Sequence, residues 1–126
     1  MEMNIRQGND DEIVYKLLKS IEKCPKTNQR KLANELGISL GSVNYFLNEI
    51  IDKGLVAVSE TTTNKRRACL YHLTPAGLIE RAAVTMRYLQ SLLKLQKSMN
   101  LEIETLKMES SKISSTIQAG LSSLYA

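Results

Sequence analysis

The chain has 126 residues, a formal net charge of +4 at pH 7 and a hydrophobic share of 43%. This length fits one domain, or a compact domain with an appended segment. Aromatic residues make up only 5%, so we expect an aliphatic, mainly helical core. The only cysteines, Cys24 and Cys69, are too few for a disulfide framework or a zinc quartet. We expect both to be buried, unreactive thiols.

The sequence carries no signal for secretion or for membrane insertion. Its first residues lack the charged and apolar regions of a signal peptide. No apolar run approaches the roughly 20 residues that span a bilayer. We therefore expect a soluble, cytoplasmic protein with no membrane partner.

The N-terminal part begins with a polar segment, residues 1–9, which we expect to be a flexible tail. Asn9 or Asp10 is suited to cap the helix that follows, and acidic residues in its first turn match the positive end of the helix dipole. Apolar residues then recur at helical spacing until Pro25 ends the pattern.

Two shorter helices follow, each with a cap at both ends. Thr27 or Asn28 can cap the first of them, and Ser39 the second. Gly37 and Gly54 come directly after the two helical patterns, where a left-handed backbone conformation commonly ends a helix.

Beyond residue 54 the pattern changes to that of a β-hairpin. Residues 55–58 and 68–73 are strand-like, and the polar, basic segment Thr61–Arg67 lies between them as the predicted tip. Thr74 and Pro75 then have the residue types of a helix start, and no proline interrupts the chain from there to Tyr125. The fold class is therefore mainly α: three helices, a hairpin and a long C-terminal helix.

The most specific pattern is that of a helix-turn-helix, between Gln29 and Leu55. Ala33 is small where two helices would approach, Gly37 supplies the turn, and Ile38 is the apolar residue at the corner. The face of the following helix that is not needed for packing is small or polar and contains no acid, which suits entry into a major groove. The predicted recognition residues are Ser39, Gly41, Ser42, Asn44, Tyr45 and Asn48. The alternative is a helical hairpin within some other all-α domain.

The hairpin after this motif predicts a winged helix-turn-helix, in which the tip contacts the DNA backbone or minor groove. The predicted wing contacts are Asn64, Lys65, Arg66 and Arg67, and the candidate phosphate contacts are Lys26, Arg30 and Lys31. Each of these basic groups has a simpler interpretation as solvated surface.

The C-terminal segment predicts a dimerisation helix with a coiled-coil seam. Alternating steps of four and three residues meet mainly apolar side chains, interrupted by Gln96 and Ser110. The predicted dimerisation residues are Leu89, Leu92, Met99, Ile103, Leu106, Ile113, Ile117 and Leu124. The alternatives are a helix that folds back near residues 98–100 or a frayed tail after Ser111. We place the DNA-binding domain at residues 10–74 and the dimerisation region at residues 75–126.

No catalytic or metal site is predicted. His72 is the only histidine and lies in a probable strand pattern, with no acid–base pair, nucleophile motif or phosphate-binding glycine loop elsewhere. We expect neither enzymatic activity nor a cofactor.

The run from Gln29 to Arg87 resembles the MarR-type winged-helix regulators. The wordings LANELGISLGSVNYFLNEIIDKGLV and YHLTPAGLIERAAVTMRYL are similar to the subgroup associated with exopolysaccharide gene clusters. The resemblance implies a homodimer that binds palindromic or pseudo-palindromic DNA, usually as a repressor. It places recognition at Ser39–Asn48 and the wing tip at Asn64–Arg67. The tip departs from the Asp-x-Arg that is common in that family.

The expected function is thus sequence-specific binding of double-stranded DNA by a homodimeric transcriptional regulator, which the resemblance implies is a repressor. Two other functions remain open at this point. The chain is alternatively a winged-helix protein-interaction module, or a replication or partition protein that binds DNA without a promoter role. No residue pattern identifies a small-molecule effector.

Overall fold

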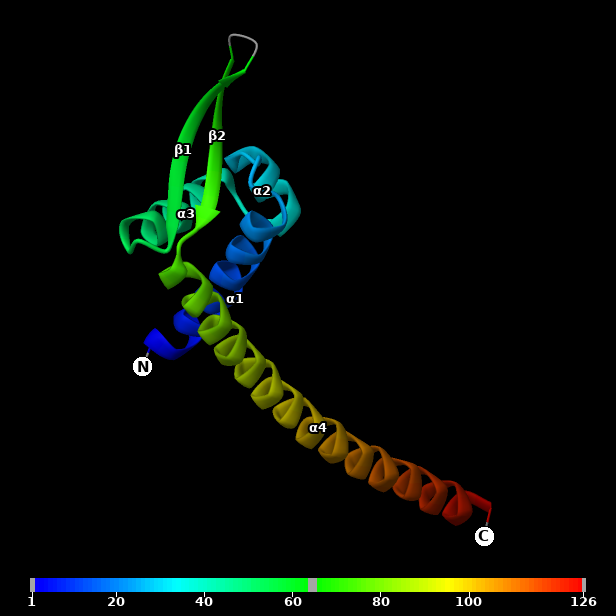
Figure 1. Cartoon of the computed structure of the whole chain (residues 1–126). Coiled ribbons are helices and arrows are strands. Elements are labelled where there is room, and N and C mark those ends of the chain that lie inside the picture. The colour runs from blue at the N-terminus through cyan, green and yellow to red at the C-terminus, as the bar shows by residue number, and fades with distance from the viewer. Residues whose placement is uncertain (1, 64–65, 126) are drawn as a thin grey trace. The chain divides into compact units, whose positions relative to one another are not determined.

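The computed structural model describes residues 2–63 and 66–125, and the side chains of residues 9–62 and 69–124. The described elements, labelled in Figure 1, confirm the expected mainly α fold class. In chain order they are α1 (Glu2–Lys23), α2 (Gln29–Leu36), α3 (Leu40–Asp52), β1 (Val56–Thr63), β2 (Arg66–Leu73) and α4 (Pro75–Tyr125). The chain divides into two compact units, one ending at Leu89 and the other beginning at Gln90.

Local capping defines the helix-turn-helix. The Asn28 side chain accepts a hydrogen bond from the backbone N–H of Lys31 at 2.8 Å, as expected of an N-cap. Gly37 ends α2 with φ of 66°, and Gly54 follows α3 with φ of 75°. Both values lie in the left-handed region that favours glycine, so the predicted turn and helix end are confirmed.

The core of the first unit is made of apolar side chains from every element of that unit. α1, α2 and α3 pack together beside the base of the β1–β2 hairpin (Figure 1). The residues buried in this core are Leu17, Leu18, Ile21, Leu32, Ala33, Val43, Phe46, Leu47, Ile50, Val56, Tyr71 and Val84. Because Val84 of α4 is among them, the first turns of α4 belong to this unit.

β1 and β2 form an antiparallel hairpin that is longer than the sequence predicted. Val56 pairs with Leu73 at the base, and Thr63 pairs with Arg66 at the far end. The predicted tip, Thr61–Arg67, is therefore corrected: only residues 64–65 lie between the strands. The sequence Thr61–Thr63 is polar and was interpreted as a loop. Threonine is β-branched, however, and favours strands, and each of these residues has a cross-strand partner.

Thr74 joins the start of α4 to the end of α3 and the start of β1. Its hydroxyl lies 2.6 Å from the Gly54 carbonyl oxygen and accepts from the Gly77 N–H at 3.0 Å. The Thr74 N–H also donates to the Leu55 carbonyl at 3.0 Å. A side chain at Gly77 would collide with that same carbonyl, so glycine is needed where these backbones meet.

Three further expectations are corrected. α1 is helical from Glu2, so residues 2–9 of the expected tail are part of a helix, and no proline in that segment opposes this. The boundary between the two parts moves from residue 75 to Leu89, because α4 packs on the core as far as Val84 and ion-pairs with α1 through Arg81 and Arg87. Cys24 and Cys69 are both exposed.

The second unit consists of the remainder of α4. The helix is continuous to Tyr125, so neither the fold-back near residue 98 nor the frayed tail occurs within the described chain. Every side chain from Leu92 to Leu124 is exposed. The stretch 113–125 contains no Asp, Glu, Lys or Arg. No helix of the described part of the chain is both long enough and apolar enough to cross a bilayer.

Candidate nucleic-acid interface

α3 has one face in the core and the other in solvent. Val43, Phe46, Leu47 and Ile50 recur at steps of three and four and are buried. The opposite face exposes Gly41, Asn44, Tyr45 and Asn48, as the sequence predicted for the recognition helix. None of these four residues is acidic, so this face does not repel a phosphate backbone.

The two serines predicted for recognition have a structural use. The Ser39 hydroxyl accepts from the Ser42 N–H at 3.1 Å and donates to the Ser42 hydroxyl at 2.9 Å. Ser39 is therefore the N-cap of α3. Its hydrogen-bonding capacity is largely used within the helix end, which leaves Ser42 the better placed of the two for an external contact.

A row of amide side chains crosses from α2 to α3. The Asn48 amide donates to the Asn44 carbonyl oxygen at 3.1 Å, and the Asn44 amide donates to the Gln29 carbonyl oxygen at 3.2 Å. Each side chain keeps donors or acceptors that this row does not use, and all of its bonds are at the surface. The row orients Asn44 before any ligand binds.

Sequence reasoning missed two residues of this surface. Gln29 begins α2, and its side chain meets that of Asn44 because α2 packs against α3. Leu40, the first residue of α3, is 47% exposed and is not among the predicted recognition residues. Its place directly after the Ser39 cap was the available signal, since the first turn of a recognition helix faces the groove.

Tyr45 combines exposure with a fixed ring. It is 59% exposed, and its ring meets that of Phe46 edge-on, with centroids 5.1 Å apart and an interplanar angle of 86°. This contact with a buried neighbour restrains the Tyr45 ring at the surface.

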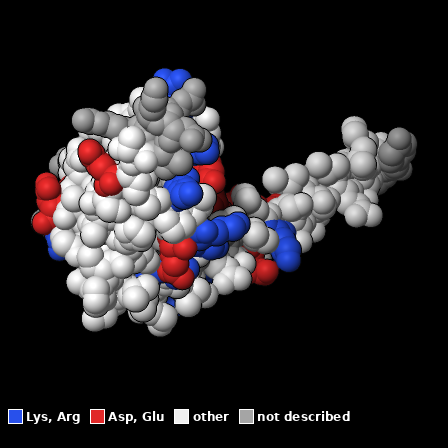
Figure 2. Space-filling model, turned by 45° about the horizontal axis from the view of Figure 1, so that its top comes forward, with Lys and Arg blue, Asp and Glu red and all other residues white. Residues whose placement is uncertain are grey.

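The predicted basic contacts are described only in part. Lys26, Arg30 and Lys31 are exposed, the last two in the first turn of α2. Asn64 and Lys65 lie outside the described residues. Arg66 and Arg67 pair through their backbones in β2, but their side chains also lie outside the described part. On the face that Figure 2 shows, acidic and basic side chains are interspersed. The assignment of the interface therefore rests on the particular residues of α2 and α3.

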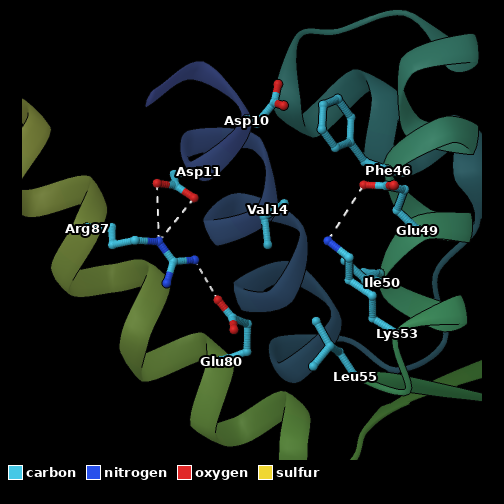
Figure 3. Close-up of a pocket in the computed structure, with 10 residues that line it drawn as sticks. All are labelled: Asp10, Asp11, Val14, Phe46, Glu49, Ile50, Lys53, Leu55, Glu80 and Arg87. Carbon is cyan, nitrogen blue, oxygen red and sulfur yellow. Dashed lines mark hydrogen bonds and ion pairs between the residues drawn. The ribbon is translucent and has the colours of Figure 1, made fainter. Parts of the chain in front are cut away.

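A pocket of about 350 Å³ lies between α1, α3 and the start of α4 (Figure 3). The Arg87 guanidinium lies 3.3 Å from the Asp11 carboxylate and 2.5 Å from Glu80. The hydrogen bond to Glu80, together with the charge of Asp11, raises the pKa of Arg87. Asp10 and Glu49 add two more carboxylates, and Lys53 is the only other cation of the lining. An anionic ligand would therefore meet an excess of negative charge here.

Among the described residues, no group of three or more His, Cys, Asp and Glu side chains is placed to hold a metal ion. His72 is exposed on β2, opposite Ala57.

Residues 10–57 match the family described as winged helix-turn-helix DNA-binding. A putative transcriptional regulatory protein for the hcr operon of Thauera aromatica is 32% identical over 65 residues, 52% of this chain. The chain spans only 39% of that relative's length. These relatives do not identify the exopolysaccharide-associated subgroup.

Two solved structures have the same fold. Wild-type MarR from E. coli, in its apo form, gives a TM-score of 0.54 at 20% identity, with 90% of this chain and 96% of MarR covered. PcaV from Streptomyces coelicolor, in complex with its natural ligand, gives a TM-score of 0.52 at 21% identity, with 61% of this chain and 54% of PcaV covered.

Proposed function

We propose that this chain, which has the winged helix-turn-helix fold of MarR, is a transcriptional regulator that binds double-stranded DNA in a sequence-specific manner. The observation that carries the proposal is the exposed surface of α3 from Leu40 to Asn48, which contains no acid. It combines a close-approach residue, Gly41, with oriented amides and a restrained tyrosine. The major groove admits an α-helix with such a face.

Asn44, Tyr45 and Asn48 are the proposed contacts to the bases. Gly41 and Ser42 lie beside the DNA, and Ser39 caps the start of the helix. An asparagine can donate to and accept from adenine at once, which is worth about 1–3 kcal/mol of discrimination against a wrong base. Asn44 suits this role because Gln29 holds its amide in place.

Affinity comes from the cations around this face. Lys26, Arg30 and Lys31 are the proposed phosphate contacts beside α2, and Asn64, Lys65, Arg66 and Arg67 those of the wing. Contacts of this kind fix the register on the duplex and release counterions, so binding weakens as salt rises.

The acting species is proposed to be a homodimer on a pseudo-palindromic operator. The exposed apolar side chains of α4, among them Ile103 and Leu106, support this because a lone helix leaves them in water. Two recognition helices then read two half-sites about one turn of DNA apart. Repression is the proposed outcome, in line with the resemblance to MarR-type regulators.

The test is selection of bound duplexes from a random pool, followed by fluorescence anisotropy on the selected site at several salt concentrations. Asn44→Ala and Asn48→Ala are expected to lower the preference for that site by roughly tenfold or more. Arg66→Ala and Arg67→Ala are expected to weaken binding to all sequences and reduce the salt slope by about one each.

Asn34→Ala, an exposed asparagine on α2, is the matched control and should leave the preference unchanged. Failure to enrich any duplex, or binding that does not respond to salt, would contradict the proposal and favour a protein-interaction role.

A further inference from the structure

The exposed stripe of the second unit follows a heptad, and its two polar members occupy the same kind of position. With Leu92 at d, the a positions hold Gln96, Ile103, Ser110, Ile117 and Leu124. The d positions hold Leu92, Met99, Leu106, Ile113 and Gly120. Gln96 and Ser110 are both a residues, and no d residue of this unit has a polar side chain.

This asymmetry distinguishes the two directions in which a second copy can pair. In a parallel, in-register pair each a residue faces the same a residue of the other copy, whereas antiparallel packing places a against d. Only the parallel pair lets Gln96 bond to Gln96 and Ser110 to Ser110. Any antiparallel register places Gln96 against a residue with no group to bond to, and a buried amide without a partner is costly.

We propose that residues 90–125 pair with a second copy of the chain as a parallel, in-register, two-stranded coiled coil whose register is set by the Gln96 layer. The pairing rests on the proposed homodimer and adds its direction and register. A single polar a residue is a known means of fixing register in such helices. Ile103 at a with Leu106 at d favours two strands, whereas Ile113 at d with Ile117 at a favours a larger number, so the two-stranded state rests on the Ile103 and Leu106 layers.

The charged residues beside the seam also favour parallel pairing. Glu102 is a g residue and Lys107 is the e residue of the next heptad, which are neighbours across a parallel pair. Within one chain Lys107 pairs with Glu104 at 3.4 Å, and both side chains are about 70% exposed. Such a weak exposed pair is readily exchanged for Glu102 of the second copy. Antiparallel pairing would place g beside g, where the charged g residues are the acids Glu102 and Glu109.

Parallel pairing has a consequence for DNA reading. Gln90 of both copies then lies at the same end of the coiled coil, so both winged domains are attached at that end. Antiparallel helices would attach them at opposite ends, separated by about 50 Å of helix.

Disulfide trapping in the full-length protein tests the direction and the register. Cys24 and Cys69 are exposed and are first replaced by serine. Gln96→Cys and Ser110→Cys are then made separately and oxidised with copper phenanthroline, and the products are separated on non-reducing gels. Most of the protein is expected to become covalent dimer in both variants.

The two sites are two heptads apart, about 21 Å along the helix. An antiparallel pair has one symmetry point and can link only one of them, and a monomer links neither. Ser115→Cys, at an f position on the outer side of the seam, is the matched control and should remain monomeric. Linking at one site only, at neither, or equally at the control overturns the inference.

Charge exchange gives a second measurement. Glu102→Lys is expected to raise the dimer dissociation constant about tenfold in sedimentation experiments, since two attractive pairs become repulsive. Adding Lys107→Glu should restore it, whereas Glu109→Lys, which faces Ser114 in the proposed register, should have the smaller effect. No restoration in the double variant contradicts the register.

These outcomes are separable from those on DNA. If both cysteine sites link but no duplex is bound, the pairing stands and the proposed function fails. If a duplex is bound with salt dependence but the cysteines do not link, the function stands and the pairing fails.

Discussion

The same residue types have opposite environments in the two units of this chain. In the first unit Leu17 and Leu47 are at most 1% exposed, whereas in the second Ile103 is 46% and Leu106 is 56% exposed. The first unit has helices, a hairpin and the start of α4 to cover its apolar side chains. The second has only the local contacts of a helix, and isolated helices are marginal in water. We therefore expect the first unit to be stable by itself, and the second to be stable only when another surface covers its apolar side chains.

The largest expected effect comes from truncating equivalent leucines in the two units. Leu47→Ala should lower the free energy of unfolding by about 2–5 kcal/mol, because a buried side chain leaves a cavity. This loss should not vary with protein concentration. Leu106→Ala should cost little in dilute protein and progressively more as concentration rises, since mass action adds the pairing energy.

Urea denaturation followed by circular dichroism at several concentrations measures both variants. Leu101→Ala, an exposed f residue of the same helix, is the control and should stay within about 0.5 kcal/mol of wild type. A Leu106→Ala effect that is the same at all concentrations would show that the seam has no partner.

Alanine substitutions at two glycines should change stability by a smaller amount and in opposite directions. Gly77→Ala should destabilise the first unit by about 1–3 kcal/mol, because the new Cβ meets the Leu55 carbonyl and the backbone must shift. Gly120→Ala has open space around it and replaces a glycine inside a helix, so it should stabilise α4 by about 0.5–1 kcal/mol. Thermal melts of the two variants check the signs, and equal signs would refute the stated packing at Gly77.

The smallest effect concerns alkaline pH and the first unit only. Burial raises the pKa of Tyr71 above its ordinary value near 10. The folded state therefore holds the proton that the unfolded chain releases, so stability is complete below pH 10 and falls as pH rises further. Tyr71→Phe should flatten this decline in denaturation curves at pH 9 to 11. An unchanged slope would mean that Tyr71 does not ionise differently in the two states.

Local features of the sequence predicted the first unit well. The caps Asn28 and Ser39 and the glycines at 37 and 54 act through hydrogen bonds and backbone angles within a few residues, so their positions can be read from the chain. Features that depend on distant partners were missed. The strand residues Thr61–Thr63 gain their partners from Arg66–Ala68 across the hairpin, and a polar loop looks the same in sequence.

The candidate site was predicted as a helix face but not in its details. The amides at Asn44 and Asn48 were identified, yet their link to Gln29 joins residues 15 positions apart. The capping use of Ser39 competes with its assignment as a DNA contact, and composition alone gives no means of choosing. The exposure of Cys24 and Cys69 was also missed, because the burial of a side chain depends on the packing of the whole unit.

The last part of α4, residues 113–125, has no charged side chain. Pairing through this segment should therefore respond to ionic strength differently from binding to DNA. Added salt weakens contacts to phosphate but leaves apolar association intact or strengthens it. For the proposed homodimer, high salt should therefore release the protein from a DNA-affinity column while the apolar pairing of residues 113–125 persists. In the proposed homodimer, ionic strength would thus change the occupancy of DNA without separating the two copies at this end of α4.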